Sequence, residues 1–308
     1  MQDEMNTVIL EQTLNGIQFG LMLFLLAAGL TLVFGIMDLV NLSHGSLYMI
    51  GAYLIATFAQ ALDSFWLGML LGIGVTACVG VLLEMTILRQ LYKRDHLSQV
   101  LGTFAIILIA NESVRILWGP QPLTFNPPGS LAGPVELFPG FEYPAYRLAI
   151  MAVGALVAAA LYVLISKTRI GMKVRAGAAD REMAEAMGAK VSWMFSGLFA
   201  CGAALCALAG GMLGPLLAVQ VGMGESILIL AFVVVVIGGI GSVRGAFVGS
   251  LLVGMIDTLG RAVIPPLFSG FGPEVASSVA PALAAILIYL LMAAILFWKP
   301  KGLFPVGA

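Results

Sequence analysis

The sequence predicts an all-α polytopic membrane protein with about eight to nine transmembrane segments, two of them broken or half-length helices in an internal repeat. Of the 308 residues, 60% are hydrophobic and 10% are charged, and the mean hydropathy is +1.04. A soluble domain carries roughly 25% charged residues. A transmembrane helix needs about 20 residues. Four runs without Asp, Glu, Lys or Arg are about that long or longer: 12–37, 148–166, 191–224 and 275–298.

Nine apolar segments follow one another, and each is expected to be a helix. In the first half they cover about residues 13–36, 43–62, 65–88, 98–118 and 146–166. In the second half they cover about residues 191–217, 226–243, 245–263 and 275–298. Residues 1–308 are therefore expected to form one transmembrane domain with a large polar loop at 167–192. Some of these segments are expected not to cross the membrane fully.

The distribution of Lys and Arg predicts the orientation of the chain in the membrane. Eleven of the 15 Lys and Arg fall in three short stretches, at 89–94, 167–190 and 299–301, whereas residues 119–146 contain none. Loops rich in Lys and Arg stay on the cytoplasmic side of a membrane. We therefore expect the basic loop and the C-terminus inside, and the N-terminus and the proline-rich loop 119–144 outside.

Residues 38–46, DLVNLSHGS, place an acid, an asparagine, a histidine and two serines between two apolar segments. In one interpretation they form a short loop, and Ser43 caps the next helix, whose free N–H groups need an acceptor. In the other interpretation the chain breaks inside the membrane, where irregular backbone is tolerated only beside a protected cavity. These residues alone favour neither interpretation.

The second half repeats this pattern in VVVVIGGIGSVRGAFVGSLLVG, residues 233–254, where His44–Gly45 compares with Arg244–Gly245. Interrupted segments at corresponding places in two halves indicate a substrate pathway, which favours the break inside the membrane. The glycines do not form a dinucleotide fingerprint, because the spacing Gly239-x-Gly241-x-x-x-Gly245 is wrong and no strand–helix alternation surrounds it. The chain also lacks a P-loop motif, so it is not expected to hydrolyse ATP.

Other polar residues suggest structural roles. Glu112 and Arg115 at i,i+3, and Asp257 and Arg261 at i,i+4, are expected to pair on their own helices. The three cysteines, at 78, 201 and 206, lie in apolar runs and are expected to be buried thiols. The chain has no basic domain that could hold nucleic acid.

Within the basic loop, residues 178–188, AADREMAEAMG, predict a short helix that ends at Gly188. Ala179, Met183 and Met187 fall on one face at four-residue spacing, and Arg181 and Glu185 fall on another. The helix is either a solvated linker or a docking helix whose small apolar face enters the groove of a partner.

Three stretches carry a family resemblance: GLTLVFGIMDLVNLSHGSLYMIGAY at 29–53, TRIGMKVRAGAADREMAEAMGAKV at 168–191 and GGIGSVRGAFVGSLLVG at 238–254. In order and separation they resemble the permease subunits of ABC importers for branched-chain amino acids and related substrates. The resemblance covers nearly the whole chain. It implies a multi-pass protein of the bacterial inner membrane with a cytoplasmic C-terminus, forming part of the translocation path for a branched-chain or other small amino acid.

The resemblance also implies partners and roles. The partners would be a second homologous permease, two cytoplasmic ATP-binding subunits, a periplasmic substrate-binding protein and membrane lipid. ATP and Mg²⁺ would bind to the ATPases, so this chain would hold no cofactor, metal or catalytic residue. The translocation path would include Asn41, Ser43, His44, Gly45, Ser46, Gly239, Gly241 and Ser242. Coupling to the ATPases would involve Asp180, Arg181, Met183, Ala184, Glu185, Met187 and Gly188.

Two other functional classes are alternatives. An ion-coupled secondary transporter of a small zwitterionic solute would need titratable groups in the membrane, for which the candidates are Asp38, His44, Glu84, Glu112 and Asp257. An intramembrane enzyme would need a nucleophile–base pair or a metal cluster. The two histidines, His44 and His96, are far apart and lack metal-ligand spacing, which argues against an enzyme.

Overall fold

The computed structural model describes residues 2–37, 39, 41–92, 94–179, 181–188, 190–268 and 279–305. All nine predicted apolar segments are helices within these ranges. They are α1 (Gln2–Met37), α2 (His44–Ala61), α3 (Phe65–Leu83), α5 (His96–Trp118), α6 (Ala145–Lys167), α9 (Val191–Leu217), α10 (Met223–Gly238), α11 (Val243–Phe268) and α12 (Ala280–Trp298). The predicted fold class, an all-α polytopic membrane protein, is confirmed.

Seven of the described helices are long and apolar enough to cross a membrane, and α2 and α10 are not among them. One of the seven candidate spans extends α3 through the π turn η1 (Glu84–Leu88) and the short α4 (Arg89–Leu91). The predicted end of the seventh segment at residue 243 is wrong. Helix α10 ends at Gly238, because Gly239 adopts φ +101°, a conformation that favours glycine and stops the helix.

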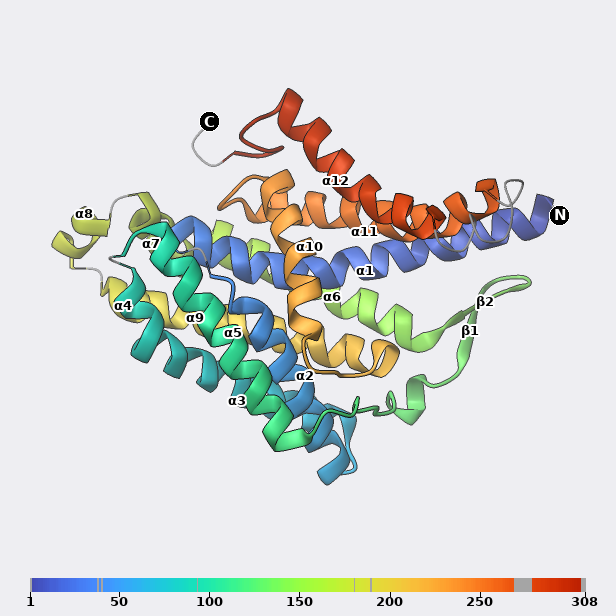
Figure 1. The fold of residues 1–308 in the computed structure, drawn as a ribbon, viewed down its shortest axis with the longest axis horizontal. Coiled ribbons are helices and arrows are strands. Elements are labelled where there is room, and N and C mark those ends of the chain that lie inside the picture. Colours follow the sequence, from blue (N-terminus) through green and yellow to red (C-terminus); the bar gives the residue numbers. More distant parts are fainter. Residues whose placement is uncertain are drawn as a thin grey trace.

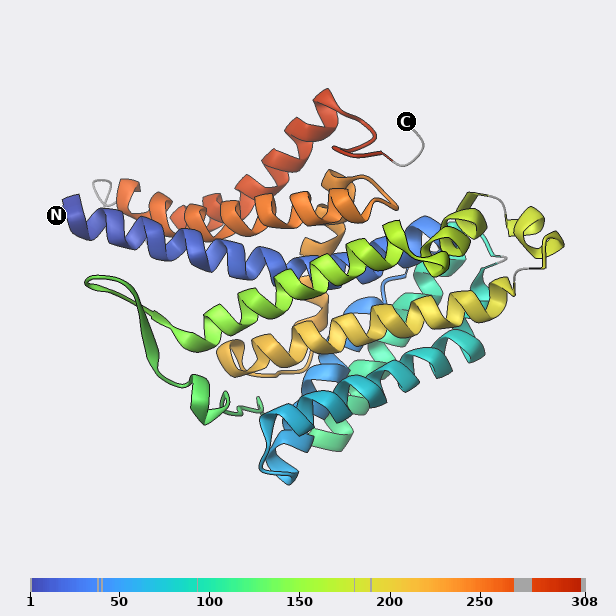
Figure 2. The ribbon, with the colours of Figure 1, turned by 180° about the vertical axis from the view of Figure 1, so that it is seen from behind.

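The long helices run roughly along the long axis of the molecule (Figure 1). The N-terminus and the hairpin of β1 (Pro134–Phe138) and β2 (Phe141–Pro144) lie at one end, and the basic loop lies at the other. Figure 2 shows the same arrangement from behind, with α6 in front of α1. Helix α1 is the centre of the bundle, since α6, α9, α10 and α11 all pack against it. Such a helix is apolar all round because every face meets protein.

The basic loop contains two helices where the sequence predicted one. Helix α7 (Arg169–Ala179) was missed, and α8 (Arg181–Ala186) corresponds to the predicted short helix. The predicted stop at Gly188 is confirmed by φ +85° and by the hydrogen bond from its N–H to the Glu185 carbonyl. Helix α7 forms because Val174 is buried on one face while Arg169 and Lys173 are exposed on others.

The expectation for the cysteines is wrong at Cys78, which is exposed on α3, whereas Cys206 is buried. Helix α3 lies at the edge of the bundle and turns apolar side chains such as Leu67 and Leu70 outward. An apolar residue in a membrane helix can face lipid, so an apolar run alone does not indicate burial in protein.

Candidate functional site

The first break, which lies between α1 and α2, consists of buried polar residues. Asn41 and Ser43 are 0% and 1% exposed. The Asn41 Oδ1 atom accepts hydrogen bonds from the Ser43 N–H at 3.0 Å and from the Ser43 hydroxyl at 2.6 Å. Ser43 occupies the N-cap position of α2, but its side chain makes no capping hydrogen bond. The expectation that its hydroxyl caps α2 is therefore wrong, because that hydroxyl donates to Asn41 instead.

His44, the first residue of α2, is fully buried between two glycines. A Cβ atom on Gly29 of α1 would lie 2.6 Å from His44 Nε2, and one on Gly202 of α9 would lie 3.0 Å from His44 Cε1. The Phe199 ring meets the imidazole edge-on at 6.2 Å between centroids. Gly29 lies six residues before the end of the apolar span 7–35, or about 9 Å inside it. This depth favours a break inside the membrane over a loop at its surface.

Gly45 and Ser46 face a different neighbour, the start of α10. A Cβ atom on Gly45 would lie 2.4 Å from the Gly224 carbonyl oxygen, so the two backbones touch. A narrow seam beside this contact is lined by α2, α5 and α10, and both Gly45 and Ser46 line it. At the same seam the Asn111 side-chain amide of α5 donates a hydrogen bond to the exposed carboxylate of Glu225.

The second break, at Gly239, Gly241 and Ser242, lies against another side of α1. The Gly241 N–H donates to Thr31 Oγ1 at 3.1 Å, and a Cβ atom on Gly35 would lie 2.2 Å from Gly241 Cα. Thr31 follows Gly29 by two residues, which corresponds to a rise of about 3 Å and a rotation of about 200°. The two breaks thus lie at nearly the same level but on opposite sides of α1.

Helix α10 connects the two breaks. Its first turn touches α2 through Gly224 and Gly45, and its last residue, Gly238, touches Gly245 in the first turn of α11. In Figure 1 it crosses the long helices at a steep angle between the α2 region and the α11 region. Gly45 and Gly245, which the sequence comparison paired, therefore both contact a glycine of α10.

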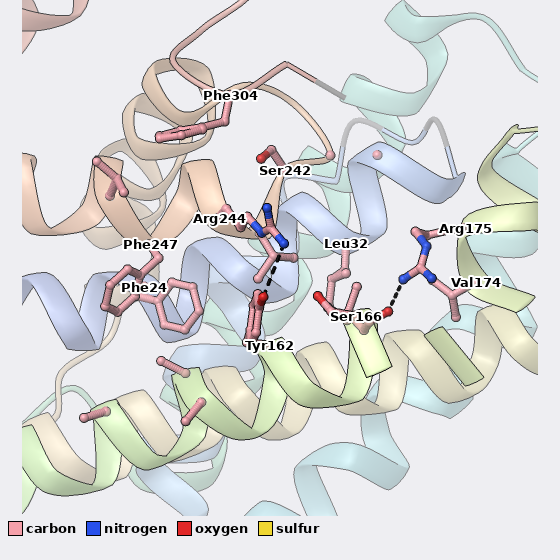
Figure 3. A pocket seen from close by; sticks show the side chains of 18 residues that line it. Phe24, Leu32, Tyr162, Ser166, Val174, Arg175, Ser242, Arg244, Phe247 and Phe304 are labelled. Carbon is pink, nitrogen blue, oxygen red and sulfur yellow. Dashed lines mark hydrogen bonds between the residues drawn. The ribbon is translucent and has the colours of Figure 1, made fainter. Parts of the chain in front are cut away.

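A cavity of about 1020 Å³ adjoins the second break. Gly241 and Ser242 line it, together with residues of α1, α6, α7 and α11 (Figure 3). Asn41, Ser43, His44, Gly45 and Ser46 do not line it. Seven of the eight residues expected to line one path thus divide among the buried residues between α1 and α2, the α2–α10 seam and this cavity. Gly239 lines neither the seam nor the cavity, and a Cβ atom on it would lie 3.0 Å from the Phe304 carbonyl oxygen.

The expected coupling residues lie at the end of the molecule that carries the basic loop (Figures 1 and 2). Met183 and Met187 are 61% and 82% exposed, and Glu185 and Gly188 are also exposed. Ala184 is buried and packs into the core. Asp180 and the side chain of Arg181 lie outside the described residues. Trp193, which the sequence analysis did not single out, is 73% exposed at the start of α9.

A buried polar cluster at the same end was also missed. Glu84 is 1% exposed and accepts hydrogen bonds from the Ser196 hydroxyl at 2.6 Å and the Tyr92 hydroxyl at 2.8 Å. The Arg89 guanidinium pairs with the Glu84 carboxylate at 3.3 Å and donates to Ser196 at 2.9 Å. The π turn brings residues five apart onto one face, so a search at the α-helical spacing of i,i+4 does not find the pair.

Both predicted intrahelical ion pairs form. Arg115 and Glu112 lie 3.3 Å apart, with side chains 55% and 60% exposed, and Arg261 and Asp257 lie 2.8 Å apart. The first pair is on α5, close to Asn111, so amide, carboxylate and guanidinium groups gather on one exposed face of a candidate membrane span.

The chain is similar in sequence to known proteins. Residues 12–296 match the model of a family described as the permease component of branched-chain amino acid transport systems. The chain is 30% identical over 306 residues to the high-affinity branched-chain amino acid transport system permease protein BraD of Pseudomonas aeruginosa, covering 96% of this chain and 95% of that protein. It is 29% identical over 275 residues to the LivH permease protein of Escherichia coli strain K12, covering 83% and 87%. A probable LivH permease protein of Methanocaldococcus jannaschii is 28% identical over 260 residues, covering 77% and 76%. No solved structure matches the chain.

Proposed function

The chain belongs to the family of permease components of branched-chain amino acid transport systems, and from this premise we propose how its residues take part in import. It is a multi-span permease of an ATP-driven importer in the inner membrane and is not itself an enzyme. The translocated solute is a branched-chain or other small amino acid. The remaining question is which part of the chain meets the solute and which part meets the ATPases.

The translocation path follows the α5–α10 face, at the contact with a second, homologous permease. The observation that supports this is the exposed polar group of Asn111, Glu112, Arg115 and Glu225 on and beside a candidate membrane span. Charges facing hydrocarbon cost a few kcal/mol or more each. A partner subunit with water between the two permeases would remove that cost.

The chemistry of this face suits a zwitterionic amino acid. Glu112 and Glu225 are carboxylates that can accept hydrogen bonds from an ammonium group, and Arg115 can donate to a carboxylate. Exposed apolar side chains of α5, such as Leu108 and Ile116, offer a surface for an aliphatic side chain. Binding there is weak because the contacts are exposed, which lets the solute leave.

The two breaks act at different distances from the solute. Gly45 and Ser46 form the wall of the path, since they line the seam that also contains Asn111 and Glu225. Asn41, Ser43 and His44 hold that wall from behind. Gly239, Gly241 and Ser242 lie at the far end of α10 and act on the path through this helix.

ATPase coupling occurs at α8. Met183 and Met187 enter a groove of one of two cytoplasmic ATPases, with Arg181 and Glu185 at the edge, Gly188 ending the helix, and Ala184 anchoring α8 to the core. Asp180, which precedes Arg181 in the sequence, is also part of the proposed coupling segment. Full burial of each methionine would contribute about 1.5–3 kcal/mol. A periplasmic binding protein docks at the opposite end. The C-terminus is on the cytoplasmic side, because Lys299 and Lys301 follow α12 and segments rich in Lys and Arg stay on that side.

Uptake by proteoliposomes tests the path. The permease pair, the ATPases and the binding protein are reconstituted, and ATP-dependent uptake of labelled leucine is measured. We expect Glu225→Gln to lower uptake severalfold without affecting complex assembly, because the seam loses its charge. Glu142→Gln, on the exposed hairpin, is the matched control and should transport normally. Normal uptake by Glu225→Gln would refute this path, and uptake abolished by collapse of a proton gradient with ATP present would indicate a secondary transporter.

ATP hydrolysis tests the coupling. Met183→Asp combined with Met187→Asp places charges in an apolar contact, so the ATPases should dissociate or no longer respond to the loaded binding protein. Lys190→Ala is the control, because an exposed rim charge is worth at most about 1 kcal/mol. Normal stimulation in the double Asp variant would exclude α8 as the coupling element.

A further inference from the structure

The cavity beside the second break is lined mostly by apolar side chains. Among the residues that the structure describes, none from α2, α3, α5, α9 or α10 lines it, so it is separate from the α5–α10 face. Phe24 and Phe247 meet edge-on at 5.3 Å between centroids and form its floor. On α6 the lining residues include Ala155, Ala158 and Ala159, whose small side chains on one helical face leave the space open.

Two cations lie at one end of this cavity. Arg244 donates a hydrogen bond to the Tyr162 hydroxyl at 3.3 Å and lies 5.3 Å from the centroid of the same ring. Arg175 of α7 donates to the Ile165 carbonyl. In Figure 3 Ser166 lies between the two guanidinium groups. No acid lines the cavity, and neither arginine has an ion-pair partner among the residues that the structure describes.

The cationic end is at the level of the membrane surface. Ser166 is the last residue but one of α6, a candidate span, and Arg175 belongs to the basic loop that follows it. Ala155 precedes Ser166 by eleven residues, so the apolar walls extend about 16 Å deeper along α6. The cavity therefore runs from the headgroup region to about the middle of a hydrocarbon core of about 30 Å.

We propose that this cavity binds an anionic phospholipid, with acyl chain against Phe24, Phe247 and the α6 alanines and phosphate between Arg175 and Arg244. Basic pockets between transmembrane helices on the cytoplasmic side are suited to anionic headgroups. A zwitterionic amino acid would also need an acceptor for its ammonium group, and the described residues of the lining include no carboxylate. Inorganic phosphate would use the arginines but leave the apolar walls exposed. The bound lipid touches Gly241 and Ser242, so membrane composition acts on the second break.

Native mass spectrometry of the purified transporter complex tests the proposal. The complex is titrated with phosphatidylglycerol, with zwitterionic phosphatidylcholine, and with inorganic phosphate as a competitor. We expect phosphatidylglycerol to be retained at least about tenfold more strongly than phosphatidylcholine. Arg175→Gln and Arg244→Gln should each weaken its retention about fivefold, which is the usual effect of one cation near anionic lipid. Arg169→Gln, which removes an exposed guanidinium of α7 that does not line the cavity, is the control and should change retention by less than about twofold.

Crosslinking identifies the occupant without disturbing the arginines. A photoreactive amino acid at Ala158, in the otherwise unchanged complex, should yield adducts with the mass of an anionic phospholipid. Equal retention of the two lipids, displacement by millimolar inorganic phosphate, or insensitivity to both arginine changes would overturn the proposal. Adducts to the second permease would also overturn it, because they would make the cavity part of a subunit interface.

Discussion

Replacing Gly45 by alanine is the sharpest perturbation that the geometry offers. The added Cβ atom would lie 2.4 Å from the Gly224 carbonyl oxygen and 3.0 Å from Leu228 Cβ. Ordinary contact begins near 3.4 Å, so the starts of α2 and α10 must separate by about 1 Å at this point. Backbone atoms cannot rotate away as the end of a side chain can.

The magnitude follows from two opposing effects. Overpacking of a close contact costs about 1–3 kcal/mol. Replacing a helical glycine with alanine stabilises the helix by about 0.5–1 kcal/mol. The net expectation is a loss of about 0.5–2 kcal/mol in stability, together with a displaced α10. Gly74→Ala on α3 is the matched control, since a Cβ atom there meets nothing within 4 Å and only the helical gain remains.

Thermal unfolding of the purified permease is monitored by size-exclusion chromatography. Leucine uptake is measured on the same samples. We expect Gly45→Ala to lower both the unfolding temperature and uptake, and Gly74→Ala to leave uptake unchanged and the unfolding temperature equal or higher. Gly224→Ala should resemble Gly45→Ala, and the double change should cost less than the sum because it breaks one contact. Equal stability and uptake for Gly45→Ala and Gly74→Ala would refute the argument that the α2–α10 contact matters.

Three further predictions follow from other contacts. Glu84→Gln should destabilise the permease by about 2 kcal/mol, since a buried acceptor of charged hydrogen bonds is lost, whereas Glu112→Gln should cost at most about 1 kcal/mol; thermal unfolding compares them. Gly241→Leu should lower uptake while the complex still assembles, because φ +81° and the contact with Gly35 leave no place for a side chain, and normal uptake would argue against a role for the second break. A cysteine at Met187, with the three native cysteines replaced, should react with an impermeant reagent only from the cytoplasmic side, so labelling in right-side-out vesicles would overturn the topology.

The positions of the nine apolar helices were predictable because each is a long, mostly apolar run. Helix α7 was not predicted, because its segment is short and carries three cations. Its burial comes from contacts distant in sequence order, such as Gly177 beside the Met194 side chain, where a Cβ atom would lie 2.6 Å from Cε. An amphipathic segment of eleven residues is too short for the apolar-run criterion, and its partner is visible only after folding.

The candidate site was predictable in part. The position of the first break was predictable because polar residues interrupt an apolar sequence. Its location inside the membrane was predictable from the similar interruption at the second break. The sides of α1 on which the two breaks lie were not predictable, because α1 is apolar all round and carries no periodic signal. The Asn111–Glu225 hydrogen bond joins residues 114 apart, and no local spacing relates them. The cluster around Glu84 depends on a π turn, which the sequence does not indicate.

The glycine contacts at the two ends of α10 also limit how this protein can vary in length. Gly224 and Gly238 are 14 residues apart, which corresponds to about 3.9 turns and about 21 Å. The two contacts therefore lie on nearly the same face of the helix. Inserting or deleting one residue between them would rotate one contact by about 100° relative to the other and shift it by about 1.5 Å. Relatives that keep both contacts should thus differ in sequence along α10 but not in the number of residues between these glycines, while loops such as 119–144 remain free to lengthen or shorten.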